Sequence, residues 1–190
     1  MNELSKAGLV IAGTLGALAL GAGVFIGSGV YDIGADDHHT KVVLAIIGQL
    51  RERSIGARAR TLAVPDLETG ASIAAGARRY AALCAGCHLA PGVTRSALRP
   101  GLYPHPPNLA QEAPREARNA FWTIKHGIKM SAMPAWGKTL DDAAIWDIVS
   151  FMRKMPAMDA QAYQLLAQED RGIPLKEPPG AAPYGPPRLR

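Results

Sequence analysis

The sequence has little of what several protein classes require. Its 190 residues include only two cysteines, too few for a scaffold held together by many disulfides. The formal net charge of +5 is too weak to predict nucleic-acid binding unless the basic residues are clustered. Neither a Ser-His-Asp pattern nor a glycine-rich phosphate loop after a strand stands out. Hydrophobic residues, in contrast, make up 48% of the chain, which excludes a wholly disordered protein.

The longest segment without a charged residue runs from Ala7 to Tyr31. Its 25 residues would form a helix of about 38 Å, enough to cross a hydrocarbon core of about 30 Å. A cleaved signal peptide is the alternative, with Ala17-Leu18-Ala19 as a small-residue cleavage pattern, but that pattern lies inside the apolar segment rather than after it. We expect a retained transmembrane anchor over residues 1–31.

Charges on the two sides of this segment predict its orientation. Lys6 precedes it, whereas Asp32, Asp36 and Asp37 follow it. Under the positive-inside rule the N-terminus is then cytoplasmic and the rest of the chain periplasmic, in a single-pass protein of the bacterial inner membrane.

Small residues recur on one side of this predicted helix. They follow steps of four, three, four and four residues: Ala12, Gly16, Ala19, Gly23 and Gly27. Inside a membrane, small residues let a second helix approach closely, so the pattern predicts contact with another membrane subunit. A plain composition bias toward alanine and glycine is the alternative.

Residues 32–71 are predicted to form a juxtamembrane amphipathic helix and a linker. Asp36 or Asp37 is the expected N-cap. The apolar positions recur at helical spacing: Val42, Val43, Ile46, Ile47 and Leu50. The segment then becomes basic: Arg51, Arg53, Arg58 and Arg60. Two interpretations stay open, because the helix can pack on the body of the protein or lie against membrane lipid or a partner.

The strongest motif is Cys84-Ala85-Gly86-Cys87-His88, the C-x-x-C-H attachment sequence of c-type haem. Two thiols three positions apart can form thioethers with the two vinyl groups of one porphyrin, and His88 can then ligate the iron. A thioredoxin-like pair does not need the histidine, a zinc site would need further ligands, and a Cys84–Cys87 disulfide has no evident role. The motif predicts one covalently attached haem c.

The iron needs a second axial ligand, and the candidates follow the motif along the chain. They are His105, His126, Met130, Met133, Met152, Met155 and Met158. Pro134 favours an extended conformation at Met133, which suits a thioether offered from a loop. Met130 and a bis-histidine pair with His126 remain alternatives, whereas Met152 and Met155 fall on an apolar helical repeat.

Three segments between residues 72 and 156 carry a resemblance to a known family. They are Gly76-x-x-x-Tyr80 ahead of the haem motif, the segment 127–136 (GIKMSAMPAW), and the helix around 145–149 (IWDIV). Together they resemble the monohaem class I c-type cytochromes. The resemblance implies an all-α domain around one haem over residues 72–156, with Met133, directly before Pro-Ala-aromatic, as the axial methionine.

The resemblance also implies two local contacts. The first and last helices of the domain would cross where Gly76 faces Trp146, and a carbonyl near Pro91 would accept the imidazole proton of His88. The helices expected around the haem span residues 72–84, 115–125 and 141–154.

A haem with both axial positions filled has no open site for oxygen, peroxide or a small-molecule substrate, which favours one-electron transfer. Residues 72–156 contain eleven basic and five acidic residues, a charge that would steer acidic redox partners. We expect a membrane-anchored periplasmic electron carrier, not itself an enzyme, that is a subunit of a respiratory membrane complex or docked to one. A haem subunit of a periplasmic dehydrogenase complex and a haem-based sensor or peroxidase are the alternatives.

Residues 157–190 are expected to contain a short helix over 160–168 and a proline-rich tail. The tail from Ile173 to Arg190 has six prolines, which cannot form a core and favour an extended, polyproline-like chain.

Overall fold

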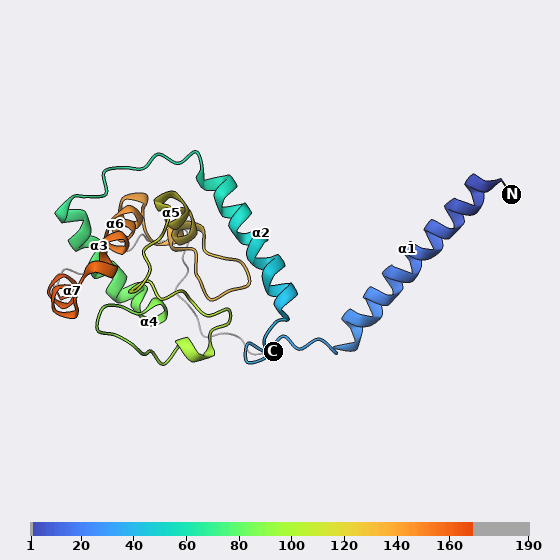
Figure 1. Ribbon diagram of the computed structural model, residues 1–190, viewed down its shortest axis with the longest axis horizontal. Coiled ribbons are helices and arrows are strands. Elements are labelled where there is room, and N and C mark those ends of the chain that lie inside the picture. The colour runs from blue at the N-terminus through green and yellow to red at the C-terminus, as the bar shows by residue number, and fades with distance from the viewer. Residues whose placement is uncertain (1, 169–190) are drawn as a thin grey trace, which may run out of the picture. The chain divides into compact units, whose positions relative to one another are not determined.

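The computed structural model describes residues 2–168, and within that range every regular element is a helix (Figure 1). The expected all-α fold class is confirmed, while the proline-rich tail lies outside the described residues. The α-helices are α1 (Glu3–Ser28), α2 (Lys41–Ala59), α3 (Gly70–Leu83), α4 (Ala85–His88), α5 (Ala117–His126), α6 (Asp142–Lys154) and α7 (Ala160–Ala167). Short 3-10 helices are η1 (Arg99–Gly101), η2 (Trp136–Lys138) and η3 (Met155–Ala157).

The chain divides into two compact units, residues 1–38 and residues 39–190. The first unit holds α1, none of whose 26 residues is buried. By length and composition α1 is the one helix of residues 2–168 that could cross a membrane, with a mean hydropathy of 2.2 over an 18-residue window. Asn2 caps its first turn by accepting a hydrogen bond from the Ser5 amide at 2.9 Å.

The second unit is built on the contact between α3 and α6, with α5 and α7 packed beside them (Figure 1). The apolar residues of α6 follow helical spacing, so that one side of the helix enters the core: Ala144, Ile145, Ile148, Val149, Phe151 and Met152. α3 adds Ala77 and Tyr80. Full burial of an isoleucine or valine side chain stabilises a fold by about 1.5–3 kcal/mol, so this contact supplies a large share of the unit's stability.

Gly76 sets the closest approach between α3 and α6. A Cβ atom at this position would lie 1.9 Å from the Asp147 carbonyl oxygen and 2.9 Å from the Phe151 Cβ. The Arg79 guanidinium donates to the Asp147 carboxylate at 2.9 Å. The Arg79 side chain is 16% exposed and the Asp147 side chain 21% exposed. A steric fit and a partly buried ion pair therefore fix the crossing within one turn of α3.

The expectation that Trp146 faces Gly76 is wrong. Trp146 stacks on Phe121 of α5, with ring centroids 4.2 Å apart and 17° between the ring planes. Phe151 packs against Gly76 instead, and its ring centroid lies 5.3 Å from that of Tyr80. Positions 146 and 151 are about 140° apart around a helix, so the two rings meet different neighbours.

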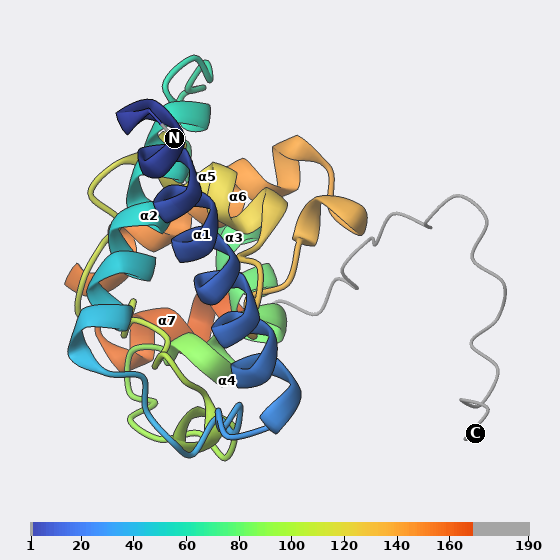
Figure 2. The ribbon, with the colours of Figure 1, turned by 90° about the vertical axis from the view of Figure 1, so that its right-hand side faces the viewer.

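α2 packs only its second half on this core. Ile55 and Ala59 are its buried residues, and α2 lies beside α5 in both views (Figures 1 and 2). Its N-cap is Thr40, whose hydroxyl accepts a hydrogen bond from the Val43 amide, so the expected cap at Asp36 or Asp37 is wrong. The Asp37 amide donates to the Gly34 carbonyl oxygen, which places these aspartates in a turn that ends before the helix.

The helices expected over 72–84, 115–125, 141–154 and 160–168 are present as α3, α5, α6 and α7, with ends shifted by at most two residues. Their starts follow from capping where a cap exists: Asp141 accepts from the Ala144 amide at 2.8 Å, and Asp159 from the Ala162 amide at 2.7 Å.

Gly76→Ala should lower the free energy of unfolding by an amount near the upper end of about 1–3 kcal/mol. The added methyl group would overlap the Asp147 main chain, which can move away only if α3 separates from α6. Gly56→Ala is the matched control, since Gly56 is also helical and a Cβ there meets nothing within 4 Å. The control should stabilise by about 0.5–1 kcal/mol. Urea unfolding of the full chain in detergent, followed by circular dichroism, measures both. Unchanged stability of Gly76→Ala would contradict the close crossing.

Candidate functional site

The Cys84–His88 motif follows α3 without a break. Cys84 ends α3, its amide donates to the Tyr80 carbonyl oxygen at 2.9 Å, and it also begins α4. The amides of Cys87 and His88 both donate to the Cys84 carbonyl oxygen, at 3.0 and 2.9 Å. This tight turn holds two thiols and one imidazole on a single short segment.

Both cysteines are free thiols, Cys84 buried and Cys87 half-buried. Burial, together with the nearby Cys87, raises the pKa of Cys84 to about 12. A redox pair of the thioredoxin type needs a lowered thiol pKa, so the surroundings of Cys84 disagree with that alternative.

The His88 imidazole is oriented by the main chain of a distant loop. Its Nδ1 lies 3.0 Å from the Pro107 carbonyl oxygen, to which a protonated Nδ1 donates. The Leu109 amide donates to the His88 carbonyl oxygen at 3.2 Å, so the loop is joined to His88 at two points. With Nδ1 engaged, Nε2 is the nitrogen left for a metal. Burial lowers the pKa of His88, which favours the neutral imidazole that a metal requires.

The expectation that a carbonyl near Pro91 accepts the His88 proton is wrong. Leu89 adopts a positive φ of 63°, which turns the chain directly after His88. The Tyr80 hydroxyl fixes that turn by donating to the Leu89 carbonyl oxygen at 2.7 Å, and burial raises the pKa of Tyr80. Pro91 then lies in the tight Ala90–Val93 turn, where the Val93 amide donates to the Ala90 carbonyl oxygen at 2.8 Å.

Met133 lies on a loop that closes on itself at Gly127. The Ile128 amide donates to the Met133 carbonyl oxygen at 3.1 Å. Gly127 has a φ of +65°, and a Cβ there would lie 2.7 Å from that same oxygen, so the closure requires glycine. The Ser131 hydroxyl donates to the Ile128 carbonyl oxygen at 2.8 Å and accepts from the Met133 amide at 3.2 Å. Main-chain contacts and the Ser131 hydroxyl together therefore fix the main chain of Met133.

The other candidate ligands lie in different surroundings. Met133 is partly buried against the core, whereas Met130 is fully exposed. Met152 and Met155 are buried inside the core, as their helical spacing predicts. His126 is the exposed last residue of α5. Met133 and Met158 both lie outside the helices and are partly buried against the core, but Met133 is the one on the loop that closes at Gly127.

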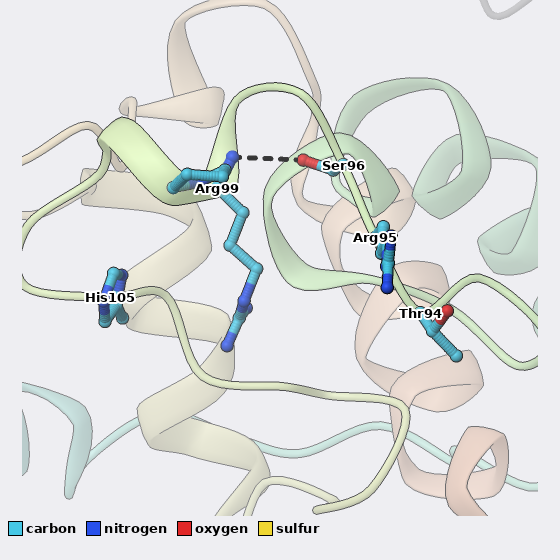
Figure 3. A pocket seen from close by; sticks show the side chains of 6 residues that line it. Thr94, Arg95, Ser96, Arg99 and His105 are labelled. Atoms are coloured by element: carbon cyan, nitrogen blue, oxygen red, sulfur yellow. Dashed lines mark hydrogen bonds between the residues drawn. The ribbon is translucent and has the colours of Figure 1, made fainter.

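A pocket of about 320 Å³ adjoins the Cys84–His88 turn (Figure 3). It is lined by Thr94, Arg95, Ser96, Arg99, Pro100 and His105. The Arg99 guanidinium donates to the Cys87 carbonyl oxygen at 3.3 Å, and the Ser96 hydroxyl donates to the Gly86 carbonyl oxygen. The Arg99 amide donates to the Ser96 hydroxyl at 3.1 Å, drawn as the dashed line in Figure 3. The cationic lining suits an anionic group such as a haem carboxylate.

The residues at this site fit a covalently attached haem. Two unbonded thiols and an imidazole with one nitrogen already engaged lie within five consecutive residues. A basic pocket beside the turn offers a place for negative charge, and the half-buried Met133 thioether lies on a separate closed loop.

The comparison with protein families agrees with this geometry. Residues 71–152, less than half of the chain, match the family described as cytochrome c oxidase, cbb3-type, subunit III. Neither the curated proteins nor the solved structures give a match. The resemblance to c-type cytochromes is therefore confirmed for the segment that contains α3 to α6. Residues 71–152 form a c-type cytochrome domain, an electron-transfer module whose cofactor is covalently bound haem c.

Proposed function

We propose that the protein is a membrane-anchored electron carrier with one haem c, held by Cys84, Cys87, His88 and Met133. The observation that supports this most directly is the 3.0 Å contact between His88 Nδ1 and the Pro107 carbonyl oxygen. That contact fixes the ring and leaves Nε2 available, next to two free thiols.

The role of each residue follows from its surroundings. Cys84 and Cys87 would hold the group covalently, and the His88 imidazole would ligate its iron. The loop closed at Gly127 holds the main chain of Met133, whose thioether would be the second ligand of the iron. When bound, the haem supplies one-electron oxidation and reduction, and methionine ligation raises its reduction potential. With both axial positions filled, the site carries electrons rather than binding a substrate.

Met133→His should lower the reduction potential by more than about 0.1 V and abolish the weak sulfur-to-iron charge-transfer absorption, because imidazole replaces the thioether. Met130→Leu is the matched control, because Met130 is fully exposed on the same loop, and it should leave both quantities unchanged. Haem should stay on the denatured chain in both variants, since Cys84 and Cys87 are unaltered. Redox titration and absorption spectra measure the effects. Loss of the band in Met130→Leu would contradict the assignment of Met133.

The anchor and the compartment are a second part of the proposal. α1 is apolar and long enough to cross a bilayer, Lys6 lies at its start, and Asp32, Asp36 and Asp37 follow its end. These charges support a single-pass anchor in the bacterial inner membrane with the cytochrome domain in the periplasm.

The partner is proposed to be a respiratory membrane complex. The matching family is described as a subunit of an oxidase, and α1 carries the stripe of small residues from Ala12 to Gly27. A Cβ at Gly16 or Gly23 meets nothing within 4 Å among the residues that the structure describes, which leaves both positions open to another helix.

Replacing Gly16 and Gly23 together with leucine should loosen association with the partner while leaving membrane insertion and the haem spectrum intact. The matched control replaces Gly13 and Gly21, which lie on the same helix but off the stripe. Co-purification in mild detergent measures the association, and the companion polypeptides distinguish a respiratory complex from a dehydrogenase complex. A wild-type protein that leaves the membrane as a lone monomer would contradict the assembly.

A further inference from the structure

The first half of α2 presents apolar side chains that nothing in residues 2–168 covers. Val42, Ile46 and Leu50 are 68%, 63% and 69% exposed, and Val43 and Ile47 beside them are also exposed. We name these five residues the outer face of α2. Such a contiguous run is unusual on a helix whose other residues are mostly polar or small.

This outer face is opposite to the side by which α2 joins the cytochrome domain. Ile55 and Ala59 are the buried residues of the helix, and Gly48 lies on the same side, about two turns before Ile55 and three before Ala59. At 100° per residue, the centre of the outer face and the centre of the buried side are about 170° apart. α2 therefore packs on α5 with one side and leaves an apolar side turned away from the domain.

The chain connection limits where this face can be. Residues 29–40 join the end of α1 to the start of α2, and twelve residues span at most about 40 Å when fully extended. If α1 crosses the membrane, as proposed above, α2 begins within reach of the lipid surface.

The charges next to the outer face suit an anionic surface. Arg53 and Arg60 are exposed and follow the apolar residues on the same side of α2, by helical spacing. An apolar strip that continues into arginines is the pattern of a helix lying in the headgroup region, where the apolar residues enter the acyl boundary and the cations meet lipid phosphate.

We propose that the outer face of α2 lies in the surface of the lipid bilayer that α1 anchors. The opposite side of α2 holds the cytochrome domain through Ile55 and Ala59, so the helix keeps the domain close to the membrane and restricts its orientation. The domain then exchanges electrons with partners at the membrane. This inference rests on the proposed anchoring by α1 but not on the assignment of the haem ligands.

Nitroxide labels on the full-length holoprotein test the proposal. Cys84 and Cys87 are consumed as thioethers when haem is attached, so Ile46→Cys, Leu50→Cys and Ala45→Cys can each be labelled at one site. Ala45 is the matched control, because it is exposed and directly precedes Ile46 but lies about 100° away around the helix. A label at Leu18→Cys in α1 reports the anchor separately. Each variant must keep the haem absorption spectrum of the wild type.

In vesicles of phosphatidylethanolamine and phosphatidylglycerol, each label is exposed to oxygen and to a water-soluble nickel chelate. The ratio of oxygen collisions to chelate collisions should be severalfold higher for the labels at positions 46 and 50 than for the label at 45. Equal, water-like ratios at all three positions, with the label at 18 inside the bilayer, would overturn the proposal while the anchor stands. A water-accessible label at 18 would instead overturn the anchor. Protection of 46 and 50 from both reagents, in vesicles and in detergent alike, would mean that a second copy or another protein covers the face.

Discussion

The contact between α3 and α6 at Gly76 is the constraint on which the site depends. α3 runs directly into Cys84, so the position of this helix determines where both thiols and His88 lie. Any side chain larger than glycine at position 76 would push α3 away from the Asp147 main chain. Four residues beyond Gly76, Tyr80 packs on Phe151 and reaches the Leu89 carbonyl oxygen. The same crossing thus stabilises the core and fixes the turn that follows His88.

Two loops from distant parts of the sequence are proposed to complete the site, and hydrogen bonds to main-chain carbonyl oxygens fix part of each. The Pro107 carbonyl oxygen orients His88, and the Met133 carbonyl oxygen closes its own loop on Ile128. A main-chain carbonyl has no side-chain rotamers of its own, so a hydrogen bond to it holds a ligand residue with little movement. Little movement between oxidation states is what outer-sphere electron transfer needs, and this agrees with the cytochrome assignment of residues 71–152.

Local sequence patterns predict much of the fold, and long-range contacts account for the errors. Helical periodicity and caps predict α3, α5, α6 and α7 within two residues, and C-x-x-C-H predicts the cofactor. The Pro107 acceptor lies 19 residues from His88 and carries no local signal beyond its proline-rich loop. Asp36, Asp37 and Thr40 are all suitable N-caps, so composition alone does not choose between them. The sequence leaves open whether α2 packs on the body or faces lipid, because the helix has two different sides. One side is buried on the domain at Ile55 and Ala59, and the other is apolar and exposed.

The proposed role of Met133 is to close the site opposite His88 as the second ligand of the iron. Titration of the reduced, full-length protein with carbon monoxide tests it most directly, because carbon monoxide binds ferrous haem only where an axial position is open or its ligand is readily displaced. We expect an absorption spectrum that carbon monoxide leaves unchanged. Tight carbon monoxide binding by the unmodified protein would contradict the closed site and favour a sensor or a peroxidase.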